Sequence, residues 1–314
     1  MNYIKKKSTS LLLPYYGWNI FYGLLINILT PYGFFANANA KHITLSSFFL
    51  EPWTDGHQYI FNIASWFLLI LFAVQISYVS LRIVSNIFGT YREYGLWVVI
   101  FIAASAATLL AQFKDTHGIM LPVLKTFFCL FFYHMGYIYK ITIEKYDKVS
   151  LSRVVIVILI QIVLVSTFKN PTYQLSWCNF NDRLIVPYIT SLTGIWINLQ
   201  LAKILAAQTT SYNMLINIGK NSFSIMVHHL FGYWILNTVY YSMSIYGLSI
   251  FKSFDSANYL NNIYYAYPIN GWSDSMLIYI VFALLISFFI KRIVEYISHV
   301  ITDCRQMYIK PIGL

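Results

Sequence analysis

Two adjacent histidines, His228 and His229, lie inside an apolar run that is long enough to cross a membrane. Imidazole binds and releases a proton near neutral pH, and a titratable group at membrane depth is a functional-site hypothesis by default. Consecutive helical side chains point about 100° apart, which predicts different roles for the two rings. One suits general-base catalysis on a hydroxyl, and the other a neutral, hydrogen-bonded packing role. The alternative, that neighbouring helices simply satisfy both rings, stays open.

The residues just before the histidines are of types that bind an anion. Lys220, Asn221 and Ser222 mark the predicted start of the helix, with Asn221 or Ser222 as its N-cap. Free N–H groups at a helix start, together with a lysine, suit a phosphate or pyrophosphate. Ordinary capping beside a topology-setting lysine is the alternative. The histidines would then lie roughly 12 Å along the helix from this end.

Composition identifies the elements that must position these groups. The chain has 314 residues, of which 58% are hydrophobic and 10% are charged, whereas soluble domains carry about 25% charged residues. The apolar residues come in blocks of about 20, the length of a membrane-spanning helix. No polar stretch is long enough to fold alone, which excludes a soluble enzyme with a membrane anchor. The sequence therefore predicts an all-α, polytopic integral membrane protein.

We predict a single integral-membrane domain over residues 1–314, with about eight spanning helices and both termini in the cytoplasm. This arrangement puts most of the 21 lysines and arginines on one side, as the positive-inside rule requires. The positive residues behind the net charge of +10 would therefore serve to orient the helices in the membrane. No nucleic-acid partner is expected. The predicted helices are 12–34, 60–83, 96–112, 119–139, 151–168, 184–206, 221–243 and 275–297.

Aromatic side chains gather in the last of three predicted outward loops, which are 35–59, 169–183 and 244–274. The last loop contains Tyr264, Tyr265 and Trp272, close to several asparagines. Such residues commonly form an interfacial belt. The functional alternative is a platform on which sugar rings stack, and Asp55 at another outward helix end is a further candidate for the acceptor site.

No pattern of metal ligands is present. The three cysteines, Cys129, Cys178 and Cys304, are far apart, and Asp55-Gly56-His57 and Asp115-Thr116-His117 have no third ligand at a suitable spacing. We interpret both triplets as solvated loop residues, and the lone helical His134 as a packing residue. No carboxylate lies well inside a predicted helix, which argues against an ion-coupled transporter.

Four segments, in order along nearly the whole chain, carry a resemblance to a known family. The segment from Gly219 to Phe231 resembles the signature near the end of the membrane acyltransferase-3 proteins. Each segment is degenerate alone, and the ordered set is moderately specific. The other three are Lys5-Lys6-Lys7 followed by Leu11-Leu12-Leu13-Pro14-Tyr15 and Trp18-Asn19, then Ser65-Trp66-Phe67-Leu68, and Phe131-Phe132-Tyr133-His134-Met135-Gly136-Tyr137.

The resemblance implies an O-acetyltransferase of the bacterial cytoplasmic (inner) membrane. Such enzymes transfer acetyl from cytosolic acetyl-CoA, a donor substrate rather than a resident cofactor, to a hydroxyl of a surface glycan. The acceptor would be a capsular, O-antigen or other polysaccharide, or its lipid-linked form. The family histidine falls on His229, with His228 beside it, and Trp66 becomes a substrate-binding candidate. Basic groups predicted on the inner side, which would hold the CoA phosphates, are Lys220, Arg82, Arg92 and Arg153.

One departure from the family pattern concerns the start of the chain. Family members usually have ten core helices, and the first carries an Arg and a His, the favoured base, about ten residues apart. Eight helices here correspond to ten minus the first two. Four explanations for the two missing helices stay open. Either the start of the chain is assigned too late, or the gene is truncated and its product inactive. Otherwise the His pair carries more of the chemistry than in the relatives, or a partner chain supplies the helices.

A non-enzymatic flippase or transporter of lipid-linked sugars is the alternative from another class. It would need more helices, and Arg or Lys at membrane depth to carry a pyrophosphate. A polysaccharide polymerase would need a large outward loop with several arginines, whereas loop 244–274 contains only Lys252.

Overall fold

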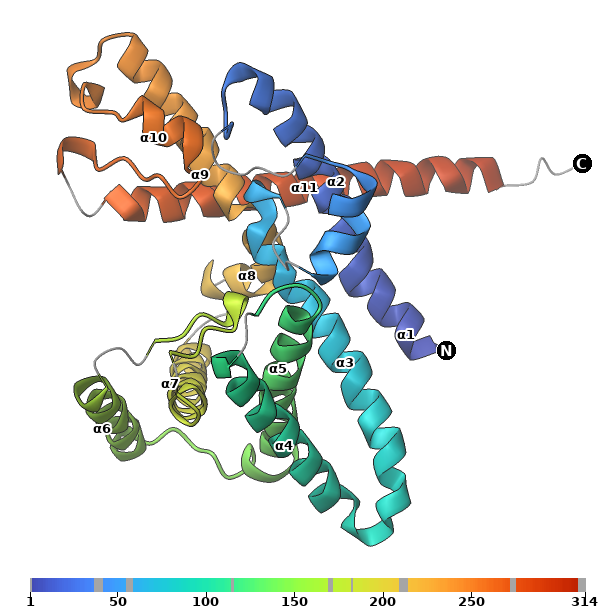
Figure 1. Cartoon of the computed structure of the whole chain (residues 1–314). Coiled ribbons are helices and arrows are strands. Elements are labelled where there is room, and N and C mark those ends of the chain that lie inside the picture. The colour runs from blue at the N-terminus through green and yellow to red at the C-terminus, as the bar shows by residue number, and fades with distance from the viewer. Residues whose placement is uncertain are drawn as a thin grey trace, which may run out of the picture. The chain divides into compact units, whose positions relative to one another are not determined.

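The computed structural model describes residues 2–36, 42–54, 59–113, 116–168, 172–181, 183–208, 214–271 and 275–309. In these ranges every regular element is helical, apart from one isolated bridge between Gln174 and Asn179. The predicted all-α class is therefore confirmed for the described residues. The α-helices (Figure 1) are α1 (Asn2–Lys7), α2 (Leu13–Leu29), α3 (Trp66–Val84), α4 (Arg92–Phe113), α5 (Met120–Ile138), α6 (Leu151–Thr167), α7 (Val186–Gln208), α8 (Met214–Lys220), α9 (Ser222–Ile245), α10 (Ser256–Asn261) and α11 (Ser275–Ile309).

Several helical stretches are long and apolar enough to cross a membrane, so the protein is a helical membrane protein. They are Ile60–Ile87, Arg92–Phe113, Met120–Ile143, Val186–Ala207 and Ser275–Thr302. The other three predicted spans are also helical. However, α2 and α6 have only 17 residues each, and α9 carries polar side chains such as His228, His229 and Asn237. The count of eight spans and the location of the termini stay predictions.

The chain groups into two compact units, between which it passes several times. The first unit comprises Met1–Gly17, Thr44–Gln58 and Trp66–Ser211, and the second comprises Trp18–Ile43, Tyr59–Ser65 and Tyr212–Leu314. The predicted single domain stays a prediction. Each unit is described by itself.

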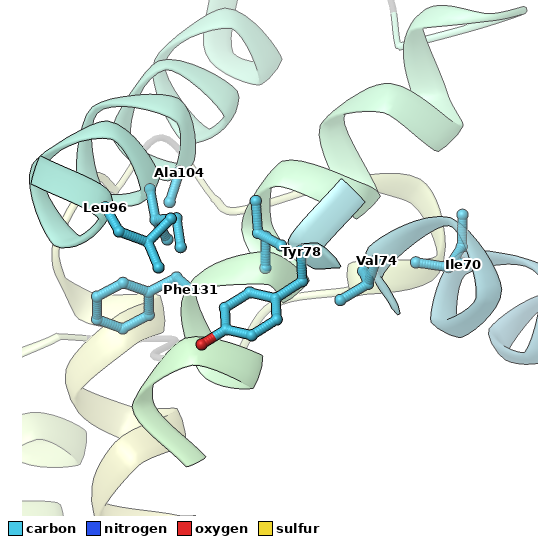
Figure 2. Close-up of a cluster of buried hydrophobic side chains, with 8 residues drawn as sticks. Ile70, Val74, Tyr78, Leu96, Ala104 and Phe131 are labelled. Carbon is cyan, nitrogen blue, oxygen red and sulfur yellow. The ribbon is translucent and has the colours of Figure 1, made fainter. Parts of the chain in front are cut away.

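The core of the first unit lies where α3, α4 and α5 meet (Figure 2). The buried residues Ile70, Val74 and Tyr78 recur every four positions along α3, and those of α4 follow the same spacing. A spacing of four places side chains on one helix face, and that face is the one buried. The cluster is completed by Leu96, Ile100 and Ala104 of α4 and Leu130 and Phe131 of α5.

The second unit is built around the packing of α9 on α11. A β-carbon on Gly232 would lie only 2.8 Å from the Cα of Ala283, so a glycine is needed for this close approach. The Ser224 hydroxyl donates to the Ser287 carbonyl at 2.8 Å, one further link between the same two helices. Backbone proximity and a buried hydrogen bond together fix the register of α9, the helix that carries the two histidines.

One face of α2 also contributes to the second unit. Asn19, Tyr22 and Ile26 are almost fully buried and follow a spacing of three and four. Gly23 lies beside them, and a β-carbon there would come within 3.0 Å of the Tyr59 ring. The Asn62 amide donates to the Asn19 side-chain oxygen at 3.0 Å. This face therefore brings polar groups of α2 into a buried environment.

Candidate functional site

His228 lies on the buried side of α9, where only 1% of its surface is exposed. The hydroxyl of Tyr22 is 2.6 Å from its Nδ1, and the Trp18 ring packs edge-on with centroids 4.2 Å apart. Within the described residues the Tyr22 hydroxyl has no other hydrogen-bond partner. A buried hydroxyl needs an acceptor for its proton, so the Tyr22 hydroxyl donates to Nδ1 of His228. The neutral His228 ring then carries its own proton on Nε2.

His229, the next residue, has the opposite proton arrangement. Its Nδ1 is 3.1 Å from the Ile225 carbonyl and 2.9 Å from the Met226 carbonyl, one turn back on α9. A carbonyl oxygen can only accept a hydrogen bond, so Nδ1 must carry the proton. Nε2 of the neutral ring then keeps its lone pair. The half-buried His229 has the tautomer of a general base, and His228 that of a hydrogen-bond donor.

A pocket of about 300 Å³ lies against His228 within the second unit. It adjoins a second pocket of about 390 Å³, because the two share Asn221, Lys291 and Glu295. Lys291 forms an ion pair with Glu295 at 3.3 Å. The other side chains of the first pocket are Trp18, Lys220, Phe223, Ser224 and Val294, and the second adds Asn217, Arg292, Leu285, Phe288 and Phe289. The described lining of the two pockets contains three cations, Lys220, Lys291 and Arg292, and one carboxylate, Glu295. Its net charge is therefore positive.

Asn221 precedes α9 at the N-cap position, as the sequence predicts, but its side chain makes no capping bond. Its amide nitrogen donates to the Asn217 carbonyl at 2.6 Å and to the Asn217 side-chain oxygen at 2.8 Å. Its amide oxygen accepts a hydrogen bond from Lys291. The side chain thus connects α8 to α11. Ser222 is the exposed first residue of α9, and Lys220, also exposed, lines the pocket.

The three predicted phosphate-binding arginines belong to the first unit. Arg82 donates to both carboxylate oxygens of Glu93, at 2.8 and 3.3 Å, and lies over the Tyr137 ring. Arg92 contacts the same carboxylate at 3.7 Å, and Arg153 forms an ion pair with Asp147 at 3.5 Å. Each arginine therefore already has an acidic partner. The structure brings Lys220, Asn221 and His228 together around one pocket of the second unit.

The predicted acceptor-binding residues have different environments. Tyr264 is 59% exposed, whereas Tyr265 is buried in the second unit, and its hydroxyl accepts the Asp255 N–H at 3.0 Å. Burial raises the pKa of Tyr265. The Trp66 ring, in the first unit, lies 4.6 Å from the buried Lys125 amine. Asp55 and Trp272 lie outside the described residues.

The sequence did not single out Tyr22, Lys291 or Ser224 as site residues. Trp18 and Asn19 were noted only as part of a motif, and Tyr22 follows Trp18 by one helical turn. A polar asparagine flanked by aromatic residues at this spacing is the signal that could have identified this face of α2. In the described part of the chain, no group of three His, Cys, Asp or Glu side chains is placed to hold a metal ion.

Comparisons of the chain with protein-family models, with curated proteins and with solved structures find no match.

Proposed function

We propose that the protein is a membrane-bound O-acetyltransferase that moves acetyl from cytosolic acetyl-CoA to a hydroxyl of a bacterial surface polysaccharide. The observation that carries the proposal is the pair of complementary histidine tautomers on α9, of which His228 lines a cationic pocket. A general base and a hydrogen-bond donor are the two groups that acyl transfer to a hydroxyl requires. The resemblance to the acyltransferase-3 proteins supports the same reaction.

The donor side of the site follows from the charges around the two adjoining pockets. Lys220, Lys291 and Arg292 line them, and such cations bind the phosphate groups of a coenzyme A. His228 stands at the deeper part of α9, two turns beyond Lys220. A thioester at the end of the pantetheine arm would reach His228 while the phosphates stay with the cations.

In the proposed reaction, Nε2 of His229 takes the proton of the acceptor hydroxyl as its oxygen attacks the thioester carbonyl carbon. The Nε2–H of His228 donates to the carbonyl oxygen, on which negative charge develops. The carbon–sulfur bond then breaks, and the proton passes from His229 to the departing thiolate. The products are the acetyl ester of the glycan and free coenzyme A, so atoms and protons balance.

The proposal includes the arrangement in the membrane. Eight spanning helices with both termini in the cytoplasm, in the inner membrane of a bacterium, would put Lys220 and Lys291 on the side where acetyl-CoA is found. The outward loops would then face the glycan.

The test is the acetyl content of the surface polysaccharide, measured by NMR on glycan purified from gene-deleted cells that carry a variant. We expect His229→Ala to lose acetylation by about 10²- to 10⁴-fold, the usual contribution of a general base. His228→Ala should have a milder effect, a loss of about 10²- to 10³-fold, the usual cost of removing one donor to the developing oxyanion. Membrane insertion is checked by immunoblotting of the membrane fraction. Full acetylation in the His229→Ala strain would disprove the assignment of the base.

A further inference from the structure

Another polar pocket lies entirely within the first unit. The end of α4, residues 116–117 and the loop 172–181 line a half-open pocket of about 420 Å³, which is in the usual range of ligand pockets, about 300–1,000 Å³. Its polar side chains are Gln112, Thr116, His117, Gln174, Asn179 and Asn181, with Trp177 beside them. The predicted topology puts this loop on the outer side of the membrane.

The wall of this pocket is held in one conformation by its backbone. Gln174 and Asn179 pair through two backbone hydrogen bonds of 2.9 and 3.1 Å. Cys178 has a φ of 50° between them, which closes the tight turn. The Thr116 hydroxyl donates to the Trp177 carbonyl at 3.1 Å and ties the turn to the segment after α4. A ligand would therefore meet a largely preformed surface.

The chemistry of the described lining favours neutral, hydroxyl-rich ligands. Amide side chains carry both donors and acceptors, which match the paired hydroxyls of a sugar. Two of these groups already have protein partners, because the Asn179 side-chain oxygen accepts the Asn181 N–H and the Asn181 amide nitrogen donates to the Thr172 carbonyl. In the described lining there is no Lys, Arg, Asp or Glu, whereas sites for phosphates or carboxylates are built from cations. The amide nitrogen of Gln112 is buried and has no hydrogen-bond partner in the described part of the chain. Such a group requires an acceptor from elsewhere.

Trp177 is the exposed aromatic residue of the lining, whose apolar part also includes Ala111, Cys178 and Phe180. It is 45% exposed despite its large ring. An indole face carries partial negative charge and packs against the weakly positive C–H face of a sugar ring. We propose that this pocket binds one neutral sugar residue of a glycan. The identification of this glycan as the acetyl acceptor rests on the proposed function. The binding of a sugar by this pocket does not.

The test is saturation-transfer NMR on the full chain in lipid nanodiscs. The probe is a set of oligosaccharides released from the unacetylated surface polysaccharide of gene-deleted cells. We expect saturation of the sugar ring protons with the wild-type protein, and a dissociation constant raised roughly tenfold by Trp177→Ala. Gln112→Met should weaken binding similarly. Because the lost amide nitrogen has no partner among the described residues, Gln112→Met should not lower stability.

Trp97→Ala is the matched control. Trp97 is a tryptophan of similar exposure to Trp177, 39% against 45%, but it lies outside the pocket. It should bind the probe as the wild type does. Wild-type binding by both pocket variants would overturn the sugar site, as would absence of binding to the wild-type chain. Either result leaves the acetylation test above unaffected. Conversely, a His229→Ala protein that binds the probe normally but does not acetylate would support both proposals.

Discussion

At the scale of single residues, the site depends on which ring nitrogen carries the proton. The Tyr22 hydroxyl determines this for His228, and two backbone carbonyls determine it for His229. Because the carbonyls belong to α9 itself, the His229 tautomer does not depend on any other element. The His228 tautomer depends on one distant hydroxyl, which makes it easy to perturb selectively.

Tyr22→Phe should reduce acetylation by roughly tenfold, the worth of one well-placed hydrogen bond of about 1.4 kcal/mol. Without the hydroxyl, nothing in the described structure keeps the His228 proton on Nε2. The measurement is the initial rate with acetyl-CoA in nanodiscs. Tyr267→Phe is the control, since it also removes a buried hydroxyl, bonded to the Ile250 carbonyl at 2.7 Å, away from the site. An equal loss of rate in both variants would contradict the tautomer argument.

Lys291→Ala should raise the KM for acetyl-CoA by roughly tenfold and leave kcat nearly unchanged. The reason is that a contact to a phosphate stabilises the bound substrate and the transition state equally. Lys291 lines both pockets, and its side chain is 38% exposed. The check is steady-state kinetics at varied donor concentration. Lys140→Ala serves as the control, since Lys140 is a surface lysine of the first unit that pairs with Glu144. A lower kcat at unchanged KM would remove Lys291 from the donor site.

The sequence reveals the histidine pair because two imidazoles in an apolar run are conspicuous. It does not reveal Tyr22, because 206 residues separate Tyr22 from His228 and nothing in the sequence specifies which helices meet. The N-cap position of Asn221 was predictable, but its use as a bridge to Lys291 was not, since that depends on where α11 packs.

At the scale of elements, α9 is held by α11. Gly232→Ala should destabilise the protein by about 1–3 kcal/mol, the usual cost of inserting a methyl group into a packed contact, because the new carbon would lie 2.8 Å from Ala283 Cα. Thermal unfolding in detergent measures the effect.

Gly136→Ala is the control for this substitution, since a β-carbon there meets nothing within 4 Å. It should be neutral or slightly stabilising, because alanine favours the helix. If both variants unfold at the wild-type temperature, the crossing is looser than the structure shows.

Helix positions were the most predictable part of the fold. Each of the eight predicted segments is helical, because runs of about 20 apolar residues are a strong signal in a membrane protein. The ends were less predictable. α11 continues to Ile309, beyond the predicted end at 297, since a polar continuation can extend a helix without an apolar signal. The short helices α1, α8 and α10 were not predicted at all.

At the scale of the whole molecule, stability against acid should depend on Asp147, in the loop between α5 and α6. Its carboxylate is buried and accepts hydrogen bonds from Tyr139 and Lys203, at 2.7 and 2.8 Å, and from Gln200. Burial acts to raise the pKa of Asp147, but these hydrogen bonds outweigh it and hold that pKa below its usual value. The ionised form therefore stabilises the fold above the unfolded-state pKa of about 4.

We expect this contribution to disappear as the pH falls below about 4, through the lowered pKa of Asp147. Asp147→Asn should cost on the order of 2 kcal/mol at neutral pH, as loss of charged hydrogen bonds does, and should flatten the acid dependence. Unfolding temperatures between pH 3 and pH 7 measure both effects. Glu144→Gln, which breaks an exposed pair with Lys140, is the control. If the unfolding temperature of Asp147→Asn depends on pH as that of the wild type does, the acid sensitivity comes from other carboxylates.

The close contact of Gly232 with Ala283 has a mechanical consequence when it is combined with the Ser224–Ser287 hydrogen bond. His228 lies midway between these two attachments, four residues or about 6 Å from each along α9. A rod clamped on both sides of a point cannot pivot there, so α9 and α11 would move as one rigid body around His228. The His228 imidazole would therefore keep its position relative to α11 during any motion of the pair.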